Sequence, residues 1–207
     1  MNSGEIQVWV VSLDKLPDGS LPAPTAGELA RADRLIPGLR QRYLRAHGAL
    51  RHILGRFAGA HLDFALTPTG KPYLPSVPEL RFNLSRSHGM AAIAAALEVD
   101  VGVDIERLRP MPEYQAIAER FFPPSEAAAL ADLPLAEREG AFFQRWTRIE
   151  AMLKATGVGL YGLGVELEGP WTLEDIEAGE GFAAAVAARC DGMTVRLAEF
   201  PGGQAGM

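Results

Sequence analysis

The sequence predicts an α+β protein made of two similar halves. Apolar and polar residues alternate in short stretches of both halves, which is the pattern of strands with one buried face. Between residues 135 and 155 apolar residues instead recur every three to four positions, as they do in a helix. Each half presents strands and helices in a similar order, so we expect a junction near Asp100 and halves of residues 1–100 and 101–207.

The first half is expected to contain three strands and two helices. Thr25 is a suitable N-cap for the first helix, and Pro37 and Gly38 are expected to end it. The segment 67–78 is rich in proline and glycine and is expected to be a loop. The expected elements are a strand at 6–13, helices at 26–35 and 40–59, and strands at 80–85 and 90–97 joined by a turn at 87–89.

The second half is expected to be richer in helix. Ser125 is a candidate N-cap, and Gly157 is expected to follow the end of the longest helix. The expected elements are a strand at 101–106, helices at 114–122, 125–133 and 135–155, strands at 163–167, 182–188 and 193–200, and a tail at 201–207 without regular structure.

Composition narrows the class of protein. The chain has 207 residues, of which 48% are apolar, and this is enough for a substantial core. The single cysteine, Cys190, excludes an internal disulfide and favours a reducing compartment. The N-terminus lacks the basic region of a signal peptide, and no apolar run approaches the ~20 residues of a membrane span. We therefore expect a cytoplasmic protein with no membrane partner.

Charge is distributed unevenly along the chain. Residues 1–100 carry a net charge of +2 and residues 101–207 a net charge of −8. Within the first half, residues 31–56 form a basic stretch. This stretch suits phosphate groups or an acidic protein partner, although a solvated helix face would explain it equally well. A nucleic-acid partner is not expected, because the pI is near 5.3 and the basic stretch lacks interleaved aromatic residues. The stretch has Asp33 as its only acid, and its arginines are Arg31, Arg34, Arg40, Arg42, Arg45, Arg51 and Arg56.

Two acids share one face of the strand expected at Val101–Glu106. The sequence V-G-V-D-I-E places Asp104 and Glu106 on the same side, about 7 Å apart along the strand. Carboxylates this close repel each other unless a cation or a proton lies between them. Arg107, Arg109 or a metal ion could supply that charge, whereas two solvated acids at a strand end are the simpler explanation.

The long helix at 135–155 supplies a third acid. Glu150 and Lys154 lie one turn apart on a stripe that borders the apolar face of this helix. They could form an exposed ion pair at the helix edge. Alternatively, Glu150 could join Asp104 and Glu106, with Lys154 holding an anion. Mg²⁺ prefers oxygen ligands, uses few carboxylates and completes its shell with water and phosphate, so such a set would suit it.

Four blocks of the chain, in this order, match one known family. They are Gly70-Lys71-Pro72, then Phe82-Asn83-Leu84-Ser85-Arg86-Ser87, then Val101-Gly102-Val103-Asp104-Ile105-Glu106, and finally Arg120-Phe121-Phe122 followed by the helical segment Trp146–Lys154. Each block alone is a weak signal, and their combination is specific. The chain resembles the Sfp-type 4'-phosphopantetheinyl transferases over residues 70–160, which attach the phosphopantetheine arm of coenzyme A to a serine of a carrier protein.

The resemblance implies a fold, a reaction and partners. The fold would be two α+β halves in a pseudo-twofold arrangement, with the active site in the cleft between them. The reaction would need Mg²⁺, would use coenzyme A and an apo acyl or peptidyl carrier protein, and would release adenosine 3',5'-bisphosphate. A monomer is expected, because each half can supply one side of the cleft. Carriers of fatty acid, polyketide and nonribosomal peptide biosynthesis share the modified serine, so the pathway stays open.

The resemblance also assigns roles to individual residues. Asp104, Glu106 and Glu150 match the family's Mg²⁺ ligands, Glu150 also matches its proposed general base, and Lys154 matches a lysine that contacts phosphate. The remaining matches and basic positions are expected to contact coenzyme A, and they are Arg31, Arg42, Lys71, Pro72, Ser85 and Arg86.

Two positions depart from the family pattern. Arg86 stands where the family has the histidine of F-N-x-S-H-S, and an arginine can bind a 3'-phosphate bidentately. Ile149 stands where a lysine often precedes the glutamate, and it belongs to the apolar stripe of the helix. These departures motivate the alternative of a non-catalytic coenzyme A-binding paralogue or regulator. A different Mg²⁺ phosphoryl enzyme would also use Asp104 and Glu106, but the other blocks argue against it.

Overall fold

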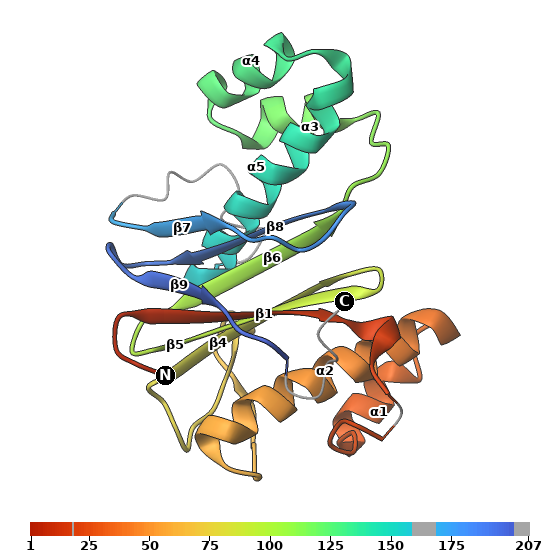
Figure 1. Cartoon of the computed structure of the whole chain (residues 1–207), viewed down its shortest axis with the longest axis vertical. Coiled ribbons are helices and arrows are strands. Elements are labelled where there is room, and N and C mark those ends of the chain that lie inside the picture. The colour runs from red at the N-terminus through yellow and green to blue at the C-terminus, as the bar shows by residue number, and fades with distance from the viewer. Residues whose placement is uncertain (18, 159–168, 201–207) are drawn as a thin grey trace.

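The protein is built in layers of mixed α and β structure. The computed structural model describes residues 1–17, 19–158 and 169–200, and Figure 1 shows its arrangement. Two sheets lie face to face, one helix layer covers the outer face of the first sheet, and the helix α5 (Leu135–Thr156) covers the outer face of the second. None of the described helices is both long and apolar enough to cross a membrane.

The first sheet has the strand order β4-β5-β1-β9. The strands β4 (Leu80–Ser87), β5 (Met90–Leu97) and β1 (Glu5–Ser12) pair antiparallel, and a tight turn at His88 and Gly89 joins the first two. The strand β9 (Thr194–Leu197) comes from the end of the chain and pairs parallel with β1. The first sheet therefore contains a strand from each end of the chain.

The second sheet has the strand order β6-β8-β7. The strand β6 (Val101–Arg107) pairs antiparallel with β8 (Phe182–Ala188), which pairs antiparallel with β7 (Thr172–Asp175). This order leaves β6 at the edge of its sheet, on the side where β4 forms the edge of the first sheet. The polar backbone groups on the free side of β6 must therefore find partners outside its own sheet.

Alternation along the strands divides the apolar residues between two cores. One core lies between the sheets, where Ile6 and Val8 of β1 meet Val103 and Ile105 of β6. The other lies between the first sheet and α2 (Pro37–Ala58), and it includes Trp9 and Phe82 in addition to the apolar face of that helix. The short helix α1 (Ala26–Ala32) packs beside α2, and the 3-10 turn η1 (Leu13–Lys15) follows β1.

A helical corner projects beyond the second sheet. The helices α3 (Tyr114–Phe121) and α4 (Pro124–Asp132) pack against the first turns of α5, around Phe122, Leu130 and Phe142. The rings of Phe122 and Phe142 are stacked with centroids 5.5 Å apart. This cluster fixes the N-terminal half of α5, and it leaves the C-terminal half to lie over the sheet.

Most of the expected elements are confirmed. The strands at 6–13, 80–85, 90–97, 101–106 and 182–188 and the helix at 135–155 are present within two residues of their expected bounds. Thr25 caps α1 as predicted, through a reciprocal capping box with Glu28. The predictions at 163–167 and 201–207 lie outside the described residues.

Several expected boundaries were wrong. Pro37 begins α2 rather than ending α1, because a proline in the first helical turn loses no hydrogen bond. Likewise Pro124 begins α4, so Ser125 lies inside the helix and does not cap it. Within the expected loop, β3 (Pro72–Tyr73) pairs with β2 (Ala65–Leu66). The strand β9 is shorter than expected, and β7 was missed because only its first residue is buried.

The mixed α+β class is confirmed, whereas the division into halves remains a prediction. Residues 1–100 contribute α1, α2 and three strands of the first sheet, and residues 101–200 contribute the second sheet and α5. The crossing of β9 into the first sheet ties the two parts together.

The helix α5 lies so close to β6 that only glycine fits at position 102. A Cβ atom on Gly102 would lie 2.1 Å from the backbone oxygen of Ala151 and 2.4 Å from the backbone nitrogen of Ala155. Both of these atoms belong to the helix backbone and cannot move aside independently. Gly102 thus sets the distance between the strand and the helix.

We predict that Gly102→Ala destabilises the protein by about 1–3 kcal/mol or more, since the added methyl group must push α5 away from β6. Gly140→Ala is the matched control, because a Cβ at this position of α5 meets nothing within 4 Å. The control should be neutral or stabilise by about 0.5–1 kcal/mol. Urea unfolding of both variants measures the difference, and equal stabilities would contradict the close approach.

Candidate active site

The strand β6 directs its acids away from the core between the sheets. Val101, Val103 and Ile105 are buried in that core, so Asp104 and Glu106 point to the opposite side, where Gly102 faces α5. This alternation confirms the expectation that the two acids share one face of the strand.

Asp104 is a buried carboxylate with one satisfied oxygen. Its side chain is almost fully buried, with 3% of the residue exposed. The Ser85 hydroxyl donates to its Oδ1 at 2.7 Å, and the Lys154 ammonium donates to the same oxygen at 2.5 Å. Lys154 also donates to the Ser85 hydroxyl at 2.9 Å. Among the described residues Oδ2 of Asp104 has no hydrogen-bond partner, so one buried carboxylate oxygen is available for another ligand.

The helix α5 brings Glu150 and Lys154 to the same place. Both residues lie in the part of α5 that packs over β6, one turn apart. Burial raises the pKa of the Glu150 carboxyl, Lys154 lowers it, and the negative charges of Asp104 and Glu106 raise it further. Both acids are therefore close enough for their charges to affect Glu150.

Glu106 lies at the more open end of this region. The Ser87 hydroxyl donates to its Oε2 at 2.9 Å, and the Arg109 guanidinium lies 3.5 Å from the same oxygen. The Arg109 guanidinium also stacks over the ring of Phe143, 5.2 Å from its centroid. Arg109 was one of the cations considered from the sequence, and the structure pairs it with Glu106.

A preformed metal cage is not found in the described part of the chain. Residues 1–17, 19–158 and 169–200 contain no group of three or more His, Cys, Asp or Glu side chains arranged to hold a metal ion. The orphaned Oδ2 of Asp104 nevertheless fits a hard cation, because it is a buried carboxylate oxygen with two further acids nearby. The ligand set Asp104, Glu106 and Glu150 therefore stays a prediction.

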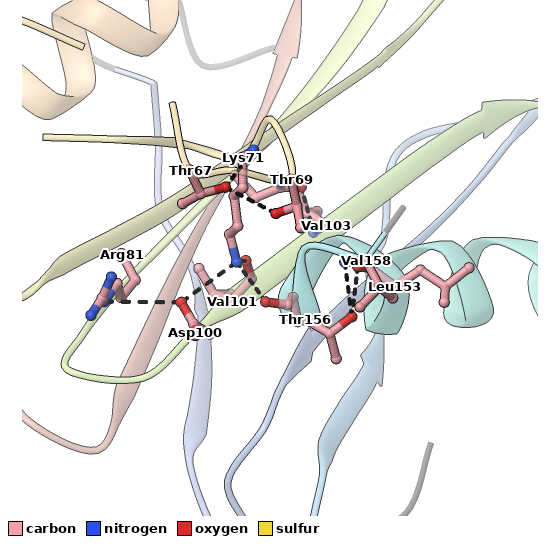
Figure 2. Close-up of polar contacts among 12 residues, drawn as sticks. Thr67, Thr69, Lys71, Arg81, Asp100, Val101, Val103, Leu153, Thr156 and Val158 are labelled. Atoms are coloured by element: carbon pink, nitrogen blue, oxygen red, sulfur yellow. Dashed lines mark hydrogen bonds and ion pairs between the residues drawn. The ribbon is translucent and has the colours of Figure 1, made fainter. Parts of the chain in front are cut away.

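Lys71 lies at the other end of β6 and holds backbone groups. Its ammonium donates to the carbonyl oxygens of Ala155 at 2.6 Å and Val101 at 3.2 Å, and it lies 3.6 Å from Asp100 (Figure 2). Burial lowers the pKa of this lysine, and the charge of Asp100 opposes that effect. Lys71 thus ties the last turn of α5 to the start of β6.

A small cavity lies beside Lys71. It has a volume of about 120 Å³ and is lined by hydroxyl and charged groups together with Pro72 and Gly157. Figure 2 shows Thr67 and Thr69 beside the backbone of Lys71, and Arg81 on the other side of Asp100 from the Lys71 ammonium. The G-K-P loop therefore forms one wall of a polar recess at the end of the β6–α5 contact.

The other expected coenzyme A contacts are divided between two places. Arg86 is exposed, and its guanidinium lies over the Tyr43 ring, 5.4 Å from the centroid. Arg31 is close enough for its charge to affect the pKa of both Tyr43 and Arg86. Arg42, by contrast, makes a bidentate ion pair with Asp14, with N–O distances of 3.0 and 2.7 Å. Its guanidinium is therefore already paired with a carboxylate, whereas the exposed guanidinium of Arg86 lies over an aromatic ring.

Comparison with known proteins places this site in a family. The model of the 4'-phosphopantetheinyl transferase superfamily matches residues 100–186, which contain β6 and α5. The chain is 38% identical over 169 residues to the 4'-phosphopantetheinyl transferase HetI of Nostoc, and this alignment covers 76% of the chain and 71% of the relative. The chain belongs to the 4'-phosphopantetheinyl transferase superfamily.

The chain also aligns with other members of the superfamily over shorter stretches. A putative 4'-phosphopantetheinyl transferase of Synechocystis is 36% identical over 75% of the chain and 66% of its own length. The 4'-phosphopantetheinyl transferase psf-1 of Bacillus pumilus is 37% identical over 55% of the chain and 49% of its own length. The chain thus spans about half to seven tenths of these relatives. Lys71, Ser85 and Arg86 lie outside the segment that the superfamily model matches.

Several residues around the superfamily site have contacts that were not expected from the sequence. Ser87 and Asn83 contact β6 by hydrogen bonds to Glu106 and to the backbone of Val103, respectively. The alternation of polar residues in F-N-L-S-R-S was a signal that could have found them. Arg51 was counted as part of a basic stretch, yet it is buried and bonds to Glu28 and to two loop carbonyl groups.

His47 lies beside Tyr43, near the charges of Arg31, Arg51 and Arg86, and its partial burial favours the uncharged form. Its ring is 4.2 Å from the Tyr43 ring. Burial lowers the pKa of His47 to about 4, Glu28 opposes this shift, and the charges of Arg86, Arg51 and Arg31 reinforce it. The ordinary pKa of this group is 6.5, so the unfolded chain binds a proton between pH 6.5 and about 4 that the folded chain does not.

We predict that His47→Gln weakens the acid sensitivity of the fold. The stability that the neutral His47 contributes is fully present above pH 6.5 and falls as the pH falls toward about 4. The free energy of unfolding should therefore decrease less on acidification in the variant than in the original protein. Urea titrations across this range measure it, with His61→Gln at an exposed histidine as the control. The same acid dependence in His47→Gln and the original protein would refute the prediction.

Proposed function

We propose that this protein transfers the 4'-phosphopantetheine group of coenzyme A to a serine of an apo acyl or peptidyl carrier protein. The reaction depends on Mg²⁺ and releases adenosine 3',5'-bisphosphate. The observation that carries the proposal is the buried Asp104, which is paired with Lys154 through one oxygen and whose other oxygen has no partner among the described residues. Membership of the superfamily supports the substrate and the reaction class.

The metal would be held by Asp104, Glu106 and Glu150. Mg²⁺ binds through few protein carboxylates and keeps water or substrate phosphate in its shell, so the open arrangement of these acids suits it. When bound, Mg²⁺ neutralises phosphate charge and polarises the phosphoryl group under attack. The three carboxylates would in turn be relieved of the mutual repulsion that raises the pKa of Glu150.

Glu150 is also the proposed general base. In the reaction the oxygen of the carrier serine forms a bond to the β-phosphorus of coenzyme A, and the bond from that phosphorus to the bridging oxygen breaks. The hydroxyl proton passes to the Glu150 carboxylate, and the leaving phosphate takes the electron pair. Burial is the largest cause of the raised pKa of the Glu150 carboxyl, and a higher pKa favours acceptance of the proton.

The cations of the site would bind the remaining phosphate charge. Lys154, which is paired with Asp104, is the residue proposed to contact the pyrophosphate. Arg86 and Arg31 near Tyr43 form the proposed site for the 3'-phosphate, because an arginine can bind phosphate bidentately. Lys71, Pro72, Ser85 and Arg42 complete the proposed coenzyme A contacts, although Arg42 would have to leave Asp14 to take part.

The departure at Ile149 is compatible with an active enzyme. Ile149 packs against the apolar cluster of α3, α4 and α5, so its side chain serves the helical corner. The alternative of a non-catalytic coenzyme A-binding paralogue rests on this position and on Arg86. We further propose that the protein acts as a cytoplasmic monomer, with residues 1–100 and 101–207 forming the two sides of the site.

A transfer assay separates the two functions. The protein is incubated with coenzyme A, Mg²⁺ and several apo carrier domains, and intact-protein mass spectrometry measures the gain of one phosphopantetheine group. Modification of at least one carrier is the expected result. Binding of coenzyme A without modification of any carrier would instead favour the regulator.

We predict that Glu150→Gln abolishes transfer, with a loss of at least about 100-fold in kcat, because the amide can neither accept the serine proton nor carry negative charge. The variant should unfold at a temperature equal to or above that of the original protein, since an uncharged group replaces a partly buried acid. Glu137→Gln, at an exposed position in the first turn of the same helix, is the control. Activity retained by Glu150→Gln would remove this residue from the mechanism.

We predict that Arg86→Ala weakens the binding of coenzyme A more than the binding of 3'-dephospho-coenzyme A. The ratio of the two KM values should change by about tenfold. The missing guanidinium would contact only the 3'-phosphate, and a charge-assisted hydrogen bond is worth about this factor. Arg189→Ala, at an exposed arginine that follows β8, provides the comparison. Equal losses for the two substrates would refute the assignment of Arg86.

A further inference from the structure

We infer that alternate residues of β4, namely Asn83, Ser85 and Ser87, are positioning residues that fix β6 and the carboxylates of Asp104 and Glu106. This inference deepens the proposed function and rests on it for the role of the two acids. Its structural basis is independent of that role, because every contact lies between two described strands.

The first step is the arrangement of two sheet edges. The strands β4 and β6 each form the edge of a different sheet, and the two edges lie next to each other. The backbone groups on this side of β6 are not paired with β8, and β4 pairs with β5 on its other side. The gap between the sheets is therefore joined by side chains of β4 rather than by a continuous ladder.

The second step is the match of register. The Asn83 side-chain oxygen accepts a hydrogen bond from the backbone N–H of Val103 at 3.0 Å. Four residues further along both strands, the Ser87 hydroxyl accepts one from the backbone N–H of Arg107 at 3.1 Å. The equal spacing means that one strand is aligned with the other at two points. Ser85 lies midway, on the same face of β4.

The third step is the hold on the two acids. The Ser85 hydroxyl donates to Oδ1 of Asp104 at 2.7 Å, and the Ser87 hydroxyl donates to Oε2 of Glu106 at 2.9 Å. Each serine of β4 thus bonds to one carboxylate of β6. The bond to Oδ1 of Asp104 leaves its Oδ2 as the oxygen without a partner.

The hydrogen-bonding capacity of the two serines supports a positioning role. A serine hydroxyl has one proton to donate. The Ser85 proton goes to Asp104 while its oxygen accepts from Lys154, and the Ser87 proton goes to Glu106 while its oxygen accepts from Arg107. Neither serine retains a proton for a substrate phosphate. Ser85 would therefore act on coenzyme A through Asp104 and Lys154.

The consequence of losing this alignment is large, because strand side chains have a period of two. A shift of β6 by one residue would turn Asp104 toward the apolar core and Ile105 toward the site. Contacts that orient metal-binding carboxylates typically change metal affinity or activity by about 10- to 100-fold when removed.

Ser87→Ala is the direct test, since Ser87 is only partly buried and the variant is expected to fold. The backbone amide of Arg107 should exchange with solvent at least about tenfold faster, as measured by NMR on the protein without metal. Mn²⁺, used as a paramagnetic probe, should bind about tenfold more weakly, and kcat should fall about tenfold while the KM for coenzyme A changes less than about twofold. Ser87→Thr keeps the hydroxyl and should restore all three values.

Ser125→Ala, at an exposed serine of α4, is the matched control and should leave these values unchanged. A second variant, Asn83→Ala, should speed exchange of the Val103 amide, which the Ser87 change should not affect. Unchanged Arg107 exchange in Ser87→Ala, or an increase in the KM for coenzyme A with kcat unchanged, would overturn the inference. An original protein that modifies no carrier would refute the proposed function, whereas the exchange measurement would still test the alignment.

Discussion

The close packing of α5 on β6 at Gly102 is the contact on which the rest of the site depends. The strand carries two of the acids and the helix carries the third acid and a lysine, and these elements are far apart in the sequence. Because a side chain at position 102 would collide with the helix backbone, this close approach of strand and helix requires glycine there. This approach brings the Lys154 ammonium to 2.5 Å from Asp104.

The buried charge of Asp104 is stabilised by groups from two neighbouring elements. A buried charge is unfavourable unless it is paired and hydrogen-bonded. The strand β6 supplies the acid, α5 supplies the cation, and β4 supplies the hydroxyl group of Ser85. Removing either partner would leave Asp104 under-compensated, whereas its Oδ2 remains available for a cation.

Several of the basic residues make structural contacts within the protein. Arg51 is buried and holds Glu28 and the loop before α1, and Lys71 holds the end of α5. Arg42 is paired with Asp14. Arg86, in contrast, is exposed with its guanidinium over an aromatic ring. A basic stretch in the sequence is therefore partly a set of structural ties.

The sequence by itself determined the strands, the long helix and the identity of the candidate acids. The period of two in V-G-V-D-I-E sets Asp104 and Glu106 on one face, and the helical period sets Glu150 one turn from Lys154, because these relations depend only on local backbone geometry. Proline positions were misread where a first-turn proline begins a helix, as at Pro37. The short strand β7 was not predicted, because most of its residues are exposed and show no apolar alternation.

Only the tertiary structure decided which groups meet. Three contacts bring together residues that are remote in the sequence. They are the packing of α5 on β6, the pairing of β9 with β1 and the hydrogen bonds between β4 and β6. Local periodicity cannot specify them, since they arise from how sheets and helices pack. The same is true of Lys71, for which the family resemblance implied a coenzyme A contact and whose ammonium lies on the carbonyl groups of Val101 and Ala155.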